Sequence, residues 1–114
     1  MNAKRQACLD LLGAAADLRT RVANTAMYGG DILDRLAEIR SSTADVQVQA
    51  AKVSFLESKL VRSAGSLAEA AANLAANAIA KTDTSTGVMT APSFKAFDDA
   101  VENFKSEAIA DGVT

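Results

Sequence analysis

The sequence contains no histidine and no tryptophan, and it has one cysteine and one proline among its 114 residues. Without histidine, the chain lacks the commonest general base, the commonest metal ligand and the usual partner of a serine or cysteine nucleophile. It also has no glycine-rich phosphate loop and no Cys-x-x-Cys pair. We therefore expect a protein that is not an enzyme, with no catalytic residues, no cofactor and no metal site.

The cysteine, Cys8, has no second thiol with which to form an internal disulfide. Its position within an apolar helical pattern predicts a small core residue rather than a reactive thiol. Residues 1–16 lack the continuous apolar core of a signal peptide because Asp10 interrupts them, and no run approaches the ~20 apolar residues of a membrane span. We expect synthesis in the cytoplasm and no membrane span, which still allows a place in an exported or virion particle.

Charge is low and evenly distributed. The net charge is −2 and the isoelectric point is near 5.0. Lysine and arginine are scattered along the chain and do not cluster. Because nucleic-acid surfaces depend on neutralising phosphates, we expect no nucleic-acid partner.

Alanine dominates what is present, at about a fifth of all residues. Alanine is the best helix former, so composition favours an all-α protein. The hydrophobic fraction is 49%, but there are only four Phe and one Tyr. Each alanine buries much less area than a leucine. We therefore expect part of the apolar surface to be covered by a partner or by other copies of the chain, and we predict a homo-oligomer.

A heptad pattern runs from about Ser42 to Lys81 and predicts one long helix. Large apolar residues recur every seven positions, and a small residue follows four positions after each, with Glu57 as the interruption. The large residues are Val46, Val53, Leu60, Leu67 and Leu74, and the alanines are Ala50, Ala64, Ala71 and Ala78. Large residues alternating with alanine are typical of helices that approach each other closely.

Turn residues divide the chain into segments of one helical domain, residues 1–114. Tyr28-Gly29-Gly30-Asp31 predicts a kink or a tight turn in the first arm. The Ser41-Ser42-Thr43 cluster, with Asp45 following, predicts the hairpin turn. The expected elements are a kinked first arm over about 3–40, a long central helix over 43–81, a flexible polar loop over 82–92 and a C-terminal helix over 93–110 that packs back on an antiparallel, coiled-coil-like hairpin.

Two surfaces are candidates for contact with other subunits. The second half of the predicted central helix has alanine at every fourth position, at Ala64, Ala68, Ala72, Ala76 and Ala80. We call this set the alanine ridge. The C-terminal helix carries a phenylalanine face, at Phe94, Phe97 and Phe104. This face predicts either a latch that closes the hairpin core or an anchor in a partner groove.

These patterns favour a non-enzymatic structural subunit of a self-assembling or multi-protein particle. Long alanine-rich hairpins with a polar turn are similar in general style to subunits of helical secretion filaments, to small secreted helical-hairpin proteins and to helical phage components. The Trp-x-Gly turn of one such secreted family is absent. Two alternatives remain: an adaptor or chaperone-like binding module, and a small-ligand or pigment carrier that uses Cys8 or the Tyr28-Gly29-Gly30 corner.

Overall fold

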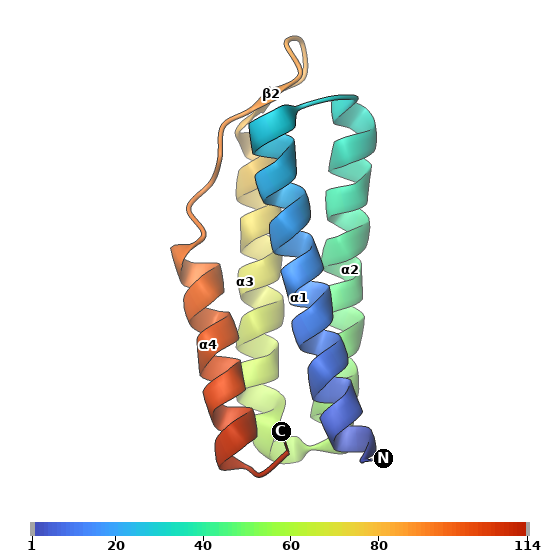
Figure 1. Ribbon diagram of the computed structural model, residues 1–114, viewed down its shortest axis with the longest axis vertical. Helices are drawn as coiled ribbons and strands as arrows, with labels where there is room; N and C mark the ends of the chain where they lie inside the picture. Colours follow the sequence, from blue (N-terminus) through green and yellow to red (C-terminus); the bar gives the residue numbers. More distant parts are fainter. Residues whose placement is uncertain (1, 114) are drawn as a thin grey trace.

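Four helices run alternately up and down the long axis of the computed structural model, which describes residues 2–113 (Figure 1). The elements in order are α1 (Ala3–Tyr28), α2 (Ile32–Leu56), the 3-10 turn η1 (Ser58–Leu60), α3 (Val61–Ala80), β1 (Thr82–Asp83), β2 (Val88–Met89) and α4 (Lys95–Ala110). The molecule measures 47 × 23 × 17 Å. The all-α class is confirmed, as is the C-terminal helix that packs back on the antiparallel helices before it.

The predicted heptad pattern marks the core correctly. All five large seam residues are buried, and so are the four alanines; these are Val46, Ala50, Val53, Leu60, Ala64, Leu67, Ala71, Leu74 and Ala78. They form one connected cluster with the inner faces of α1 and α4. The molecule is long relative to its width because α1 and α2 contain 26 and 25 residues, at about 1.5 Å of rise per residue.

The predicted hairpin turn at Ser41-Ser42-Thr43 is wrong, because these residues lie inside α2. Thr43 Oγ1 donates to the carbonyl oxygen of Ile39 at 2.8 Å, and Ser42 Oγ donates to Asp17 Oδ2 on α1 at 3.0 Å. The hydroxyls therefore find partners without a turn, both along the helix and across to its neighbour.

The first reversal of the chain is at Gly29 and Gly30 instead. Their φ angles are +67° and +104°, values that side chains disfavour and glycine adopts freely. Asp31 then caps α2 by accepting a hydrogen bond from the backbone N–H of Asp34. Of the two predicted possibilities at this site, a tight turn is correct and a kink within one arm is not.

The single central helix predicted over 43–81 is also wrong, because the chain reverses at Glu57. Glu57 has extended backbone, with φ −140° and ψ 97°, and its Oε1 accepts a hydrogen bond from the backbone N–H of Lys59 at 3.2 Å. The only interruption in the predicted seam is thus the turn itself. Val53 and Leu60, seven residues apart, lie on opposite sides of that turn and both face the core.

The connector over 82–92 contains a short antiparallel hairpin, in which Thr82 pairs with Met89 and Asp83 with Val88. Asp83 Oδ1 organises its tip by accepting hydrogen bonds from the backbone N–H and the hydroxyl of Ser85. Met89 is buried among the core residues. Residues 82–89 of the predicted polar loop therefore form a short hairpin that lies at the α1–α2 turn end of the bundle (Figure 1), and the flexibility of the loop stays a prediction.

The position of the turn can be tested with two glycine substitutions. Gly30→Ala should lower the free energy of unfolding by at least about 1 kcal/mol, because alanine is strained at positive φ. Gly65→Ala in α3 is the matched control: its added Cβ would meet nothing within 4 Å, and it should raise the free energy of unfolding by about 0.5–1 kcal/mol. Urea unfolding followed by circular dichroism measures both. Equal effects of the same sign would contradict the assigned turn.

Candidate functional site: the outer face of α2

The alanine ridge does not form one surface. Its members are four residues apart, so each step turns about 40° around a helix of 3.6 residues per turn. Ala64 is fully buried in the core, Ala68 and Ala72 are half-buried, and Ala76 and Ala80 are exposed. The structure therefore does not bring these residues together as a single contact face, and their role at an interface stays a prediction.

The phenylalanine face lies mainly inside the bundle. Phe97 and Phe104 are buried to 2% and 0% exposure, which corresponds to the latch of the two predicted alternatives. Phe94, at the start of α4, is half-buried. The guanidinium carbon of Arg19 lies 4.4 Å from the centre of its ring. Only Phe94 of the three is thus available at the surface.

The most exposed aromatic side chain lies elsewhere, on α2. Phe55 is 90% exposed and Val48 is 52% exposed. Together with Ala51, Lys52 and Leu56 they line one almost entirely apolar depression, which we call the α2 patch. A fully exposed phenylalanine loses the burial that usually stabilises it, so such a patch is typical of a protein-binding surface.

Sequence reasoning missed the α2 patch, although the sequence contains a signal for it. The outer face of α2 has its own heptad pattern with alternating spacings of four and three, at Ala37, Ser41, Ala44, Val48, Ala51 and Phe55. All six residues are exposed. We call this set the outer seam. α2 therefore carries a core-facing seam and a solvent-facing seam on opposite sides.

An ion pair holds α4 to α1 at the level of Phe94. Arg19 Nε donates to Asp98 Oδ1 at 2.8 Å, and Arg19 Nη2 donates to Asp98 Oδ2 at 3.0 Å. These hydrogen bonds lower the pKa of Asp98, with the positive charge of Arg19 as a further cause. Because the pair is bidentate and also stacks on Phe94, its geometry is more favourable than that of most surface ion pairs.

A second polar cluster lies around Glu57, at the end of the bundle that contains the α2–α3 turn. Lys4 Nζ lies 3.2 Å from Glu57 Oε2, and Lys59 Nζ lies 3.7 Å from Asp111 Oδ1. The pKa of Glu57 is lowered, first by the hydrogen bond from the backbone N–H of Lys59 and then by the one from Lys4. These contacts tie the start of α1 and the end of α4 to the α2–α3 turn.

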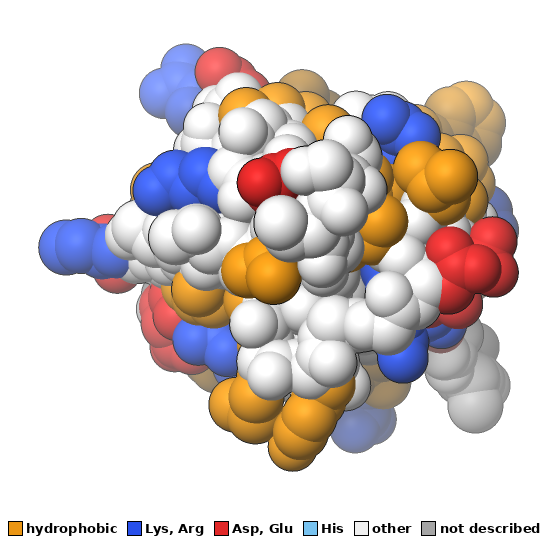
Figure 2. Space-filling view, turned by 90° about the horizontal axis from the view of Figure 1, so that it is seen from above, with side chains coloured by type: hydrophobic (Ala, Val, Ile, Leu, Met, Phe, Trp, Pro, Cys, Tyr) orange, Lys and Arg blue, Asp and Glu red, His pale blue; other side chains and the backbone are white. Residues whose placement is uncertain are grey.

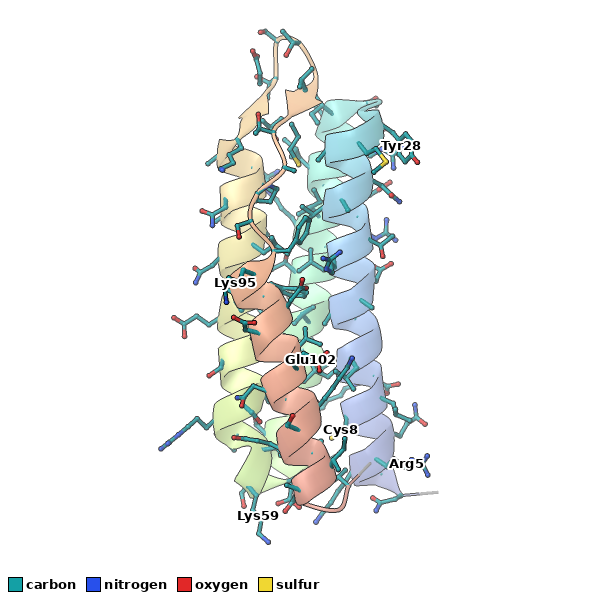
Figure 3. The ribbon with its side chains drawn as sticks, turned by 60° about the vertical axis from the view of Figure 1, so that its left-hand side comes forward. Arg5, Cys8, Tyr28, Lys59, Lys95 and Glu102 are labelled. Atoms are coloured by element: carbon teal, nitrogen blue, oxygen red, sulfur yellow. The ribbon has the colours of Figure 1, made fainter. Side chains whose placement is uncertain are left out.

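The two ligand positions considered from the sequence differ, because Cys8 is closed to solvent whereas the Tyr28-Gly29-Gly30 corner borders a surface hollow. Cys8 is fully buried between the helices near the Glu57 end (Figure 3), which confirms its prediction as a core residue. Burial raises the pKa of its thiol, with Asp111 and Glu57 contributing further. The Tyr28-Gly29-Gly30 corner lies against the β1–β2 hairpin, with Gly87 and Val88 lining the same hollow.

Charges of both signs are interspersed over the end of the molecule shown in Figure 2. Within residues 2–113, no three cysteine or carboxylate side chains gather closely enough to hold a metal ion, and no helix has the length and apolar character needed to cross a membrane. Comparison of the chain with protein-family models, with curated proteins and with solved structures gave no match. The molecule's own surface is therefore the basis for a functional proposal.

The Arg19–Asp98 pair predicts a pH-dependent contribution to stability. Since the pKa of Asp98 is lowered in the folded protein, the contribution is present above the unfolded pKa of about 3.9 and is lost as the pH falls through the lower folded value. Asp98→Asn should lower the free energy of unfolding by up to about 1 kcal/mol at pH 7 and by much less near pH 3. Asp99→Asn is the control, because Asp99 pairs with Lys95 within α4. Chemical unfolding of both variants and the wild type at pH 7 and near pH 3 measures the free energies. A decrease in the free energy of unfolding of Asp98→Asn that is the same at both pH values would contradict the prediction.

Proposed function

We propose that the protein is a non-enzymatic structural subunit that builds into a larger protein assembly through the outer face of α2. The observation that carries the proposal is the α2 patch, in which Phe55 is 90% exposed beside Val48 and Leu56. In a protein with only four phenylalanines, placing one almost entirely in solvent is unfavourable unless another protein covers it.

The rest of the bundle supports this choice of surface. The phenylalanines of α4 and the leucines of α3 are used in the core, as Phe97, Phe104 and Leu67 illustrate. The outer face of α2 instead keeps Val48 and Phe55 free, and the ion pairs that link α1 to α4 and to the α2–α3 turn lie on other faces of the bundle. The fold is therefore complete without the outer seam, which leaves that seam available for a partner.

An adaptor that holds a partner segment is a second candidate function, favoured by one specific feature. A groove of about 600 Å³ separates α1 from α4 and is lined by Leu12, Gly13, Ala16 and Val101 among others. A Cβ atom at Gly13 would meet nothing within 4 Å, so the groove has free space beside this residue of α1. An adaptor of this kind predicts a monomer alone and a stoichiometric complex with a different protein.

Replacing Phe55 tests the proposed function. The mass of the wild-type protein, measured by light scattering after size exclusion, should rise with concentration. Phe55→Gln should weaken this association at least about tenfold, because removing an aromatic anchor from an interface commonly costs about 2 kcal/mol or more. Phe55 is exposed, so circular dichroism should show unchanged folding.

Ile109→Gln is the matched control. Ile109 is also a large exposed apolar residue, at 64%, but it lies on α4 away from the α2 patch. This variant should associate like the wild type. A wild-type protein that stays monomeric at every attainable concentration, or equal effects of the two substitutions, would overturn the proposed role of the α2 patch and favour the adaptor.

A further inference from the structure

We infer that the partner on the outer face of α2 is a second copy of this chain, bound through a two-fold antiparallel pair of α2 helices. The inference rests on the proposed function and specifies its geometry. It follows from the order of large and small residues along the outer seam, all of which are exposed. Spacings of four and three are those of a helix that packs against another helix along a seam.

The outer seam is complementary to itself when two copies run in opposite directions. Its residues alternate between a set that grows in size, Ser41, Val48 and Phe55, and a set of alanines, Ala37, Ala44 and Ala51. If the two-fold axis passes at the level of residue 46, Phe55 lies opposite Ala37 of the second copy. Val48 then lies opposite Ala44, and Ser41 opposite Ala51. Every layer therefore combines an alanine with a phenylalanine, a valine or a serine.

A parallel pair would pack much less evenly. It would place Phe55 against its own copy and each alanine against its own copy, so wide layers would alternate with narrow ones along the same two helices. Straight helices keep a nearly constant separation, so such a pair would leave voids beside the alanines.

Other antiparallel registers pair fewer seam residues within α2. A shift of one heptad in one direction would move Phe55 opposite Gly30, before the start of α2. The same shift in the other direction would move Ser41 opposite Ser58, beyond the end of α2. The register centred on residue 46 keeps all six residues of the outer seam in contact.

In the antiparallel register, charges beside the outer seam attract at two symmetric positions and repel at one, so size complementarity and not charge selects this register. Glu38 and Lys52 flank the seam on the same side and would lie across from each other in the two copies. Lys52 makes no ion pair within residues 2–113, whereas Glu38 already accepts from Arg21 at 3.2 Å. The two copies of Asp45 would face each other near the axis, which is unfavourable. The parallel pair would instead bring Arg40 near Asp45.

Mixed cysteine cross-linking tests the register directly. A Ser41→Cys protein and an affinity-tagged Ala51→Cys protein are mixed and oxidised, and the products are separated by mass. The antiparallel pair should yield the mixed product, which joins position 41 of one copy to position 51 of the other, at least about tenfold above same-position products, because pairing raises the local thiol concentration. Wild-type protein, with Cys8 buried, and Ser66→Cys on α3 give the background.

Each outcome has a definite meaning. A predominant mixed product supports the inference, whereas predominant same-position products would show a parallel pair and overturn it. Background cross-linking alone, with wild-type protein that still associates and a Phe55→Gln variant that does not, would overturn the register while leaving the proposed function standing. Wild-type protein that remains monomeric would overturn both.

Asp45→Asn gives a second test, whose sign differs between the two arrangements. In the antiparallel pair the substitution removes a repulsion at the axis, so the dissociation constant should fall about two- to fivefold, as expected for a solvent-exposed charge pair. In the parallel pair it would remove the attraction to Arg40 and raise the dissociation constant. Sedimentation equilibrium of wild-type and variant protein at low salt measures the change, and an increase would contradict the inference.

Discussion

The close approach of helices across alanine is the constraint on which the rest of this structure depends. Ala64, Ala71 and Ala78 are fully buried along α3, and they face helices that could not come so near if these positions held larger side chains. Such a core is thin. Each large core residue buries more apolar area than an alanine, and α4 contributes Phe97 and Phe104, two of the largest fully or almost fully buried side chains.

Which residues face the core could be read from the sequence, whereas the direction of the chain could not. Val53 and Leu60 belong to one heptad pattern and both are buried, yet the chain reverses between them at Glu57. Periodicity reports which side of a segment is apolar, and an antiparallel turn that preserves the register leaves the pattern intact. The serine cluster failed as a turn signal because Ser42 finds its partner on Asp17, a contact between residues far apart in sequence.

The wrong prediction of a turn at residues 41–43 also prevented recognition of the outer seam from the sequence. A turn at residues 41–43 would divide the outer seam between two helices, so its regular spacing has meaning only when α2 is continuous from Ile32 to Leu56. The sequence instead predicted the alanine ridge as a contact surface. Residues spaced four apart turn progressively around a helix, however, so Ala64 and Ala80 lie on different sides of α3. Residue type also could not identify the contact surface. Phe97 and Phe104 belong to the core, and only their exposure in the structure distinguishes them from Phe55.

In the proposed assembly, the two seams on opposite sides of α2 would have separate roles, the inner one in folding and the outer one in association. The inner seam uses β-branched and small residues, Val46, Ala50 and Val53, which are buried in the isolated chain. The outer seam ends in Phe55, whose burial needs a second molecule, so this part of the apolar free energy is released only on association. A single helix pair lies at the small end of specific interfaces, which commonly bury about 1,200–2,000 Å². Association through α2 would therefore be reversible and governed by concentration, and a stable particle would require further contacts on other faces, such as the part of α4 where Ile109 remains exposed.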